Sequence, residues 1–186
     1  DLVRSRGLGD VYKRQVFPTI NRMREEGRKF TGVLYVGLML TEEGPRVLEY
    51  NCRFGDPETQ VQMLRLESDL VDVLLNALEG NVLRTEMRWS EKASACVVLA
   101  SGGYPLAYEK GKPITGLKEA SAIPGIGIFH AGTKYEDGAY FTNGGRVLNI
   151  CASAKMLAEA LGNIYSAISA ISFEGMHCRR DIGAMK

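Results

Sequence analysis

The chain has 186 residues, of which 45% are apolar, with 23 basic and 22 acidic side chains and a net charge of +1. This composition fits one moderate globular domain or two small ones with a sizeable core. The dispersed charges give no basic face for nucleic acid, and no apolar run reaches the ~18 residues of a membrane span. No apolar signal segment is present either, so a cytoplasmic location is expected by default.

The first fifteen residues, Asp1 to Gln15, carry several basic side chains and two glycines without a convincing period. We interpret them as an extraneous or flexible arm that replaces the true upstream sequence. From Val16 onward, the spacing of Val16, Ile20 and Met23 predicts an amphipathic helix that ends near Gly27.

An antiparallel hairpin follows, with predicted strands over 33–40 and 46–51 and a glycine-containing turn between them. Side chains two apart in a strand point to the same face, so Glu49 and Asn51 share one face while Leu48 and Tyr50 occupy the other. A carboxylate and an amide oxygen placed in this way suit a hard divalent cation such as Mg²⁺. An exposed polar strand face is the alternative interpretation.

Polar and glycine residues continue directly after this strand. Arg53 could bind phosphate or carboxylate groups through its planar guanidinium, and Gly55 allows close backbone approach. Asp56 before Pro57 reads equally well as the N-cap of a helix whose first turn contains the proline.

Apolar spacing predicts a short helix over 57–66 and a second one over 70–78, capped by Ser68 and closed by Gly80. Both helices are expected to form core. A polar interval at 81–91 precedes a change of character, and we place a domain boundary there.

The C-terminal part reads as strands at 95–100, 128–135, 139–142 and 146–152, with a helix from Ser153 to about Ser169. Loops with paired glycines follow the first strand and precede the last. His130 and His177 have no partner at catalytic-triad or zinc spacing, so we interpret both as structural or exposed. The four cysteines are also far apart and are expected to be reduced thiols: Cys52, Cys96, Cys151 and Cys178.

Six segments together resemble one enzyme family. They are 32–40, 48–60 (Leu-Glu-Tyr-Asn-Cys-Arg-Phe-Gly-Asp-Pro-Glu-Thr-Gln), 100–105, 129–133, 143–148 and 179–183, within a colinear agreement that runs from about Val16 to Lys186. On these residues the chain resembles the phosphoribosylamine–glycine ligases, the glycinamide ribonucleotide synthetases of purine biosynthesis.

The resemblance implies an α+β fold. It divides the chain into the extraneous segment 1–15, the C-terminal part of an ATP-grasp domain at 16–88 (antiparallel strands plus helices), and a small α+β C-terminal domain at 89–186.

The activity that the resemblance implies is ATP-dependent ligation of glycine to 5-phosphoribosylamine, through glycyl phosphate, with release of ADP and phosphate. No protein nucleophile is needed. Glu49 and Asn51 match the family's metal ligands and would hold Mg²⁺ or Mn²⁺ against ATP. Residues expected at the substrate by analogy with related ligases are Arg53, Asp56 and Arg146, with Arg179 or Arg180 for a phosphate.

The chain departs from the family by lacking its N-terminal half, with the glycine-recognition domain and the opposite wall of the nucleotide site. We therefore expect a truncated ligase with little or no activity alone, and the missing half as its partner. The alternative is a non-catalytic binding or assembly module that keeps the fold. Nucleic acid and membrane are not expected as partners.

Overall fold

The computed structural model describes residues 12–184, which form two compact units. The first unit comprises the chain up to Gly55 together with Asp69–Glu86, and the second comprises Asp56–Ser68 together with the chain from Met87 onward. The segment 56–68, which we expected to belong with the preceding hairpin, is therefore part of the second unit. Residues 1–11 of the predicted N-terminal arm lie outside the described residues.

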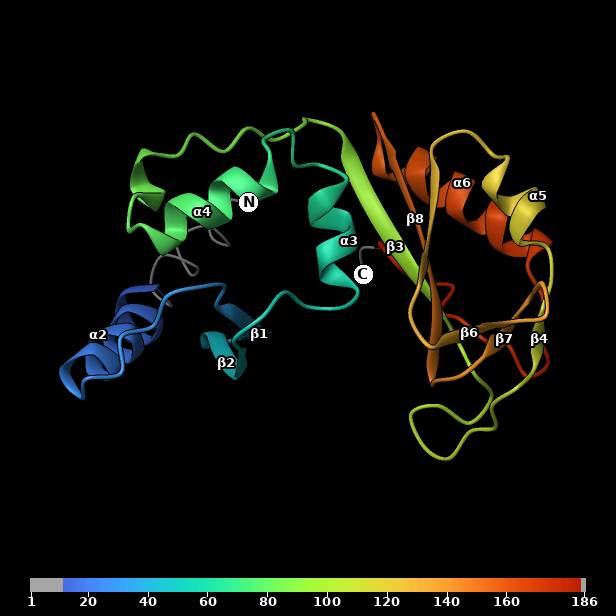
Figure 1. Ribbon diagram of the computed structural model, residues 1–186, viewed down its shortest axis with the longest axis horizontal. Helices are drawn as coiled ribbons and strands as arrows, with labels where there is room; N and C mark the ends of the chain where they lie inside the picture. Colours follow the sequence, from blue (N-terminus) through green and yellow to red (C-terminus); the bar gives the residue numbers. More distant parts are fainter. Residues whose placement is uncertain (1–11, 185–186) are drawn as a thin grey trace. The chain divides into compact units, whose positions relative to one another are not determined.

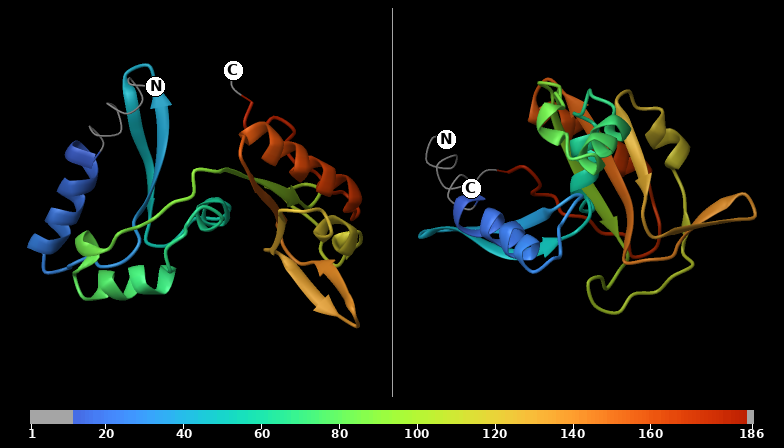
Figure 2. Two further views of the ribbon diagram at one scale, coloured as in Figure 1. Left: turned by 90° about the horizontal axis from the view of Figure 1, so that it is seen from above. Right: turned by 60° about the vertical axis from the view of Figure 1, so that its left-hand side comes forward.

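The first unit begins with two consecutive helical elements, the π-helical turn η1 (Tyr12–Val16) and α2 (Phe17–Glu25). Helix α2 confirms the predicted helix, and it carries a proline in its first turn and ends just before Gly27, which has a φ of 76°. Thr19 Oγ1 lies 3.4 Å from the Tyr50 hydroxyl, so α2 contacts the hairpin that follows (Figure 2). None of the α2 residues is buried.

The hairpin consists of β1 (Tyr35–Thr41) and β2 (Gly44–Asn51), paired antiparallel. Tyr35 lies opposite Asn51 and Gly37 lies opposite Glu49. A bulge between Gly37 and Leu38 shifts the register by one residue beyond this point, as bulges do when one strand carries an extra residue. The predicted hairpin is confirmed, with strand ends moved by one to two residues.

Helix α4 (Leu70–Leu78) and the 3₁₀ turn η2 (Val82–Arg84) complete the first unit. The N-cap of α4 is Asp69, whose Oδ1 accepts a hydrogen bond of 2.7 Å from the Val71 amide. The predicted cap, Ser68, is wrong, because its hydroxyl instead accepts from the Arg88 amide at 2.8 Å. The leucine-rich face of α4 was expected to form core, yet Leu75 and Leu78 are 52% and 73% exposed.

The second unit contains two antiparallel sheets of three strands (Figure 1). Strands β3 (Ala93–Ala100), β8 (Arg146–Ala154) and β5 (Ile126–His130) form one sheet in the order β3-β8-β5. Strands β4 (Pro113–Ile114), β7 (Ala139–Thr142) and β6 (Thr133–Glu136) form the other in the order β4-β7-β6. Helices α3 (Glu58–Met63), α5 (Leu117–Ser121) and α6 (Leu157–Ala170) complete the unit.

The core of the second unit lies between α6 and the β3-β8-β5 sheet (Figure 1). Apolar side chains from the sheet and one stripe of α6 meet there, and burying each large one stabilises the fold by roughly 1.5–3 kcal/mol. The largest fully buried apolar side chains are Leu99, Leu148, Ile150, Ile164 and Ile168.

Two predicted elements of this unit were wrong in extent. The single strand expected at 128–135 is two strands, β5 and β6. They are separated at Gly132, whose backbone lies close to the backbone of Gly144 and Arg146. A Cβ on Gly132 would stand 2.6 Å from the Arg146 carbonyl oxygen. The helix expected from Ser153 begins at Leu157, because the buried strand β8 continues to Ala154.

Helices with antiparallel sheets make this an α+β chain, as expected. Among residues 12–184, no helix is both long enough and apolar enough to cross a membrane.

Candidate functional site

Glu49 and Asn51 lie side by side near the end of β2. Asn51 Nδ2 donates a hydrogen bond of 2.9 Å to Glu49 Oε1, which confirms that the two side chains share one face of the strand. Glu49 is exposed and Asn51 is half-buried. The pair therefore presents a carboxylate and an amide to solvent at one end of the hairpin.

Gly37 makes room for the Glu49 side chain on the neighbouring strand. It lies opposite Glu49 in the pairing register, and a Cβ at Gly37 would stand 2.9 Å from Glu49 Cγ. Real Cβ atoms almost never come so close to another heavy atom, so any larger residue would displace Glu49. The sequence analysis missed this supporting residue, although a glycine inside a strand often marks a close approach.

The donor set of Glu49 and Asn51 fits a hard divalent cation, since both side chains carry oxygen and Mg²⁺ takes few protein ligands while keeping water or phosphate oxygens. Within residues 12–184, no group of three or more His, Cys, Asp or Glu side chains is arranged to hold a metal. A cation held here would therefore take its other ligands from outside this pair. The ligand role of both residues stays a prediction.

Arg53 follows the hairpin and is exposed. Its Nη1 donates to the carbonyl oxygen of the next residue, Phe54, at 3.0 Å. Arg53 belongs to the first unit with Glu49 and Asn51, while the other candidate residues, from Asp56 onward, belong to the second.

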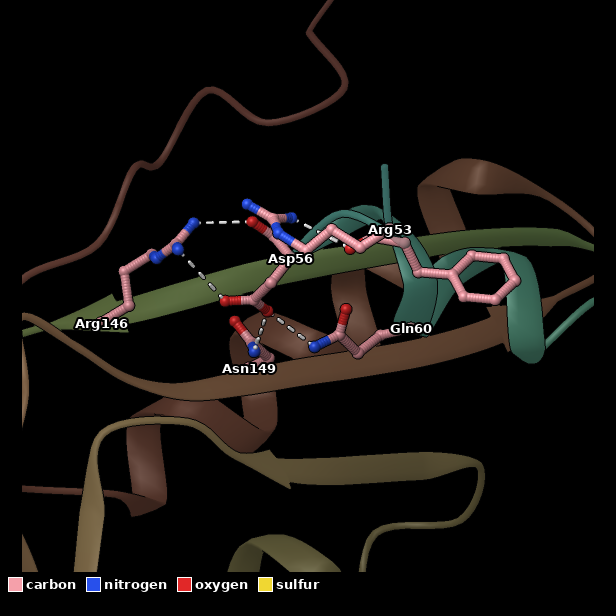
Figure 3. Close-up of polar contacts among 6 residues, drawn as sticks. Arg53, Asp56, Gln60, Arg146 and Asn149 are labelled. Carbon is pink, nitrogen blue, oxygen red and sulfur yellow. Dashed lines mark hydrogen bonds and ion pairs between the residues drawn. The ribbon is translucent and has the colours of Figure 1, made fainter. Parts of the chain in front are cut away.

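Asp56 is the centre of a polar cluster inside the second unit (Figure 3). Arg146 Nη1 donates to the Asp56 carbonyl oxygen at 2.6 Å, and Arg146 Nη2 lies 3.5 Å from Asp56 Oδ2. Asp56 Oδ1 accepts two amide hydrogen bonds, from Gln60 Nε2 at 2.8 Å and from Asn149 Nδ2 at 2.9 Å. Two of the predicted substrate residues, Asp56 and Arg146, are thus in direct contact.

The N-cap interpretation of Asp56 is wrong. Helix α3 begins at Glu58 after Pro57, without a side-chain cap hydrogen bond. The carboxylate instead contacts Arg146 and Asn149 of β8.

A bulge in β8 brings Arg146 and Asn149 to the same side of the strand. Residues three apart in a regular strand point to opposite faces. Here Leu99 pairs with Leu148 while the next residue, Ala100, pairs with Arg146, so Val147 is the extra residue. The insertion reverses the alternation, and both side chains reach Asp56.

Sequence reasoning missed Gln60 and Asn149. Gln60 follows Asp56 by four residues, which is the spacing of neighbours on one helix face. Asn149 is 1% exposed between apolar neighbours in β8. A single amide inside an apolar strand was the available signal, because buried polar side chains need a partner.

The C-terminal arginines have different surroundings. Arg179 makes a bidentate pair with Asp181, with Nε to Oδ1 at 2.9 Å and Nη2 to Oδ2 at 2.7 Å. This hydrogen bonding raises the pKa of Arg179 and lowers the pKa of Asp181. Arg180 instead places its guanidinium carbon 5.7 Å from the ring centroid of Tyr165, a cation–π contact.

The contacts of the histidines and cysteines suit structural roles. His130 Nδ1 lies 2.9 Å from Thr133 Oγ1 and its ring packs on Tyr140, and partial burial lowers the pKa of His130. All four cysteines are free thiols, as expected. Cys151 is buried opposite Cys96 in the β3–β8 pairing, and the hydrogen bond with Cys96, followed by burial, raises the pKa of Cys151.

Two family models match the chain. The model "Phosphoribosylglycinamide synthetase, ATP-grasp (A) domain" matches residues 3–59, and "Phosphoribosylglycinamide synthetase, C domain" matches residues 94–185. The first match includes Glu49, Asn51 and Asp56, and the second includes Arg146, Asn149 and the C-terminal arginines. The first match also begins inside the segment 1–15, whose extraneous origin therefore stays a prediction.

Curated relatives show the same likeness. The chain is 48% identical over 174 residues to the phosphoribosylamine–glycine ligase of Vibrio parahaemolyticus, which covers 93% of this chain and 40% of that protein. It is 49% identical over 174 residues to the enzyme of that name from Chlorobaculum tepidum, covering 94% and 41%. The chain thus spans about two fifths of the length of these relatives.

Solved structures agree with the sequence comparisons. The crystal structure of phosphoribosylamine–glycine ligase from Thermotoga maritima matches with a TM-score of 0.71 and 39% identity, over 86% of this chain and 39% of that one. N5-carboxyaminoimidazole ribonucleotide synthetase from the same organism matches with a TM-score of 0.53 at 18% identity, a likeness of fold alone.

Proposed function

Because the chain belongs to the phosphoribosylglycinamide synthetase family, we propose that it supplies the metal-binding strand and the C-terminal domain of an ATP-dependent phosphoribosylamine–glycine ligase. The reaction joins the glycine carboxyl carbon to the amine of 5-phosphoribosylamine. ATP activates the carboxylate as glycyl phosphate, the amine displaces phosphate, and the amide product is glycinamide ribonucleotide.

The observation that carries this proposal is the Glu49–Asn51 pair, which stands in the segment that matches the ATP-grasp model. These residues would hold Mg²⁺ or Mn²⁺, and such an ion neutralises phosphate charge when it is bound. Catalysis by the chain's own residues then consists of positioning substrates and balancing charge, since phosphoryl transfer needs little covalent participation by protein.

The second unit is proposed to contribute to the substrate side. Asp56, supported by Arg146, is assigned to the border of the substrate pocket. Arg53, which belongs to the first unit, is assigned to substrate binding separately. Arg180 is the better candidate than Arg179 for a substrate phosphate, because Asp181 already occupies both sides of the Arg179 fork. A guanidinium stacked on an aromatic ring keeps its edge N–H groups available to an anion.

The partner in this proposal is the remaining part of the same enzyme. In the first unit, several large apolar side chains are exposed, which is unusual for a surface that faces only water. Examples on β1, β2, α4 and η2 are Met39 (52%), Leu48 (64%), Val71 (61%), Leu78 (73%) and Leu83 (98%). We therefore assign this surface to contact with the part of the ATP-grasp domain that the relatives contain and this chain lacks.

The test is reconstitution. ADP formation dependent on both glycine and phosphoribosylamine is measured for this chain alone, for a separately produced N-terminal half, and for their mixture. We expect activity in the mixture only, and its loss with Glu49→Ala. Glu43→Ala in the hairpin turn serves as the matched control, because Glu43 pairs with Arg46 at the surface.

Activity of this chain alone would disprove the need for the missing part. A mixture that assembles but forms no ADP, while retaining both folds, would favour the non-catalytic module instead.

A further inference from the structure

Asn149 has a burial that folding alone does not explain. It is 1% exposed in β8, between Leu148 and Ile150 of the apolar core. Its Nδ2 donates to Asp56 Oδ1 at 2.9 Å, but its own Oδ1 is buried without a hydrogen-bond partner among residues 12–184. An unpaired buried acceptor destabilises a fold relative to an apolar side chain of the same shape. The hydrogen bond to Asp56 offsets this cost, so the net gain in stability from an asparagine here is small.

Gln60 repeats the same arrangement from the other side. Its Nε2 donates to the same Asp56 Oδ1 at 2.8 Å, and its Oε1 is also buried without a partner in the described part of the chain. The side-chain amides of Asn149 and Gln60 thus both donate to Asp56 Oδ1, and the amide oxygen of each is left unpaired.

The consequence for Asp56 is that its two oxygens differ. Oδ1 is occupied by both amides, which fixes the plane of the carboxylate. Oδ2 faces Arg146 Nη2 at 3.5 Å, longer than an ordinary charged hydrogen bond, so it can still accept one. The Asp56 side chain is 34% exposed, which leaves it accessible to a small molecule.

We propose that Asn149, assisted by Gln60, is a positioning residue that holds Asp56 Oδ1 so that Oδ2 receives a primary amine of the substrate. This inference rests on the proposed function, which places Asp56 at the border of the substrate pocket. Both substrates proposed to be joined, glycine and phosphoribosylamine, carry a primary amine whose N–H groups a carboxylate oxygen accepts. The test distinguishes between them.

The test compares Asn149→Leu with Ser153→Ala in the full chain. Ser153 is a matched control, because its hydroxyl is another buried, unpaired polar group on β8 but does not contact Asp56. Stability is followed by the fluorescence of Trp89, which belongs to the second unit. We expect Ser153→Ala to be at least as stable as the parent chain, since it removes an unpaired polar atom. Asn149→Leu should be close to the parent in stability, because it removes an unpaired acceptor and a hydrogen bond to Asp56 together.

In the mixture with the N-terminal half, Asn149→Leu should raise the KM for glycine or for phosphoribosylamine by about tenfold or more, the loss typical of a misplaced charged hydrogen bond. The substrate whose KM rises is the one whose amine meets Asp56. The KM for ATP and all parameters of Ser153→Ala should stay unchanged. A fall in stability that accounts for the lost activity, or an equal change in every KM, would reduce Asn149 to a structural role.

A second measurement uses this chain alone and does not depend on ligase activity. The side-chain amide signals of Gln60 in a ¹⁵N-resolved NMR spectrum should shift in Asn149→Leu, because the carboxylate reorients, and stay in place in Ser153→Ala. Unchanged Gln60 signals would overturn the positioning role. A shifted Gln60 signal, together with a parent mixture that assembles with both folds intact but forms no ADP, would reject the proposed ligase function while leaving the positioning of Asp56 intact.

Discussion

Gly37 lies directly across the hairpin from Glu49, so close that a methyl group on Gly37 would stand 2.9 Å from Glu49 Cγ. The absence of a side chain at Gly37 thus leaves the space that the side chain of Glu49, a candidate metal ligand, occupies. The hairpin bulge follows immediately, between Gly37 and Leu38. The position of the Glu49 carboxylate therefore depends on the neighbouring strand as well as on its own.

The first prediction is that Gly37→Ala weakens divalent metal binding without unfolding the chain. Overpacking at such a contact typically costs about 1–3 kcal/mol, and rotation of Glu49 away from Asn51 would relieve it. We expect the Kd for Mn²⁺ of the reconstituted assembly, measured by water proton relaxation, to rise about fivefold or more.

Gly162→Ala is the matched control for Gly37→Ala. Gly162 lies inside α6, where a Cβ meets nothing within 4 Å. It should leave the Kd unchanged and stabilise the helix by about 0.5–1 kcal/mol. If Gly37→Ala binds Mn²⁺ as tightly as the parent does, the Glu49 side chain is not constrained by Gly37.

The second prediction concerns the contact between Arg146 and Asp56. Arg146→Met removes a hydrogen bond to the Asp56 carbonyl oxygen and an ion pair at 3.5 Å. The Arg146 and Asp56 side chains are 42% and 34% exposed, so solvent screens their attraction. We therefore expect a modest loss of about 1–2 kcal/mol in the free energy of unfolding. Urea unfolding followed by Trp89 fluorescence measures it.

Arg146→Lys should recover only part of that loss, because an ammonium group cannot span the carbonyl and the carboxylate as a guanidinium does. Lys134→Met, which breaks the exposed pair of Lys134 and Glu136, should have almost no effect. An equal loss for all three variants would show that the Arg146 geometry is irrelevant to stability.

The sequence was most informative where local periodicity decides structure. The alternation around Glu49 and Asn51 correctly placed both on one strand face, because strand geometry fixes the direction of neighbouring side chains. The Asp56 cluster could not be found in this way. It depends on a β-bulge at Val147, which reverses the alternation of β8 and aims Arg146 and Asn149 at a residue about 90 positions away.

Tertiary contacts also explain the errors at element ends. Ser68 and Asp69 are both good N-cap residues. The Ser68 hydroxyl accepts a hydrogen bond from the backbone amide of Arg88, which is distant in sequence, and Asp69 caps α4 instead. The buried pairing of β8 with β3 extends that strand past Ser153, where the helix was expected to begin. Long-range partners, absent from a local pattern, decided both cases.

The third prediction is that the cysteines differ sharply in reactivity. Cys52 is exposed, whereas Cys151 is buried with a pKa raised by its hydrogen bond to Cys96 and by burial. Because the thiolate is the nucleophile, iodoacetamide at neutral pH should label Cys52 and leave Cys151 unmodified, as measured by peptide mass spectrometry. Equal labelling in urea is the control. Rapid labelling of Cys151 in the folded chain would contradict its burial in β8.

The fourth prediction concerns the pH dependence of the Arg179–Asp181 pair. The hydrogen bonds from Arg179 lower the pKa of Asp181. The ion pair is therefore fully present above the ordinary carboxyl pKa, and it is lost only when the pH falls through the lowered pKa. In Arg179→Met, the pKa of Asp181 should rise back toward the ordinary value of about 3.9. A ¹³C NMR titration of the Asp181 carboxyl group measures it, with Lys134→Met as a control that should leave it unchanged.

The same pair makes a functional distinction between the two arginines. At neutral pH Asp181 keeps the Arg179 fork occupied, while Arg180 rests on Tyr165. In the reconstituted ligase, Arg180→Met should therefore raise the KM for phosphoribosylamine more than Arg179→Met does, and Asp181→Asn should not mimic the loss of Arg180. If Arg179→Met has the larger effect, the fork must leave Asp181 when the substrate phosphate binds, and Arg179 is the phosphate ligand.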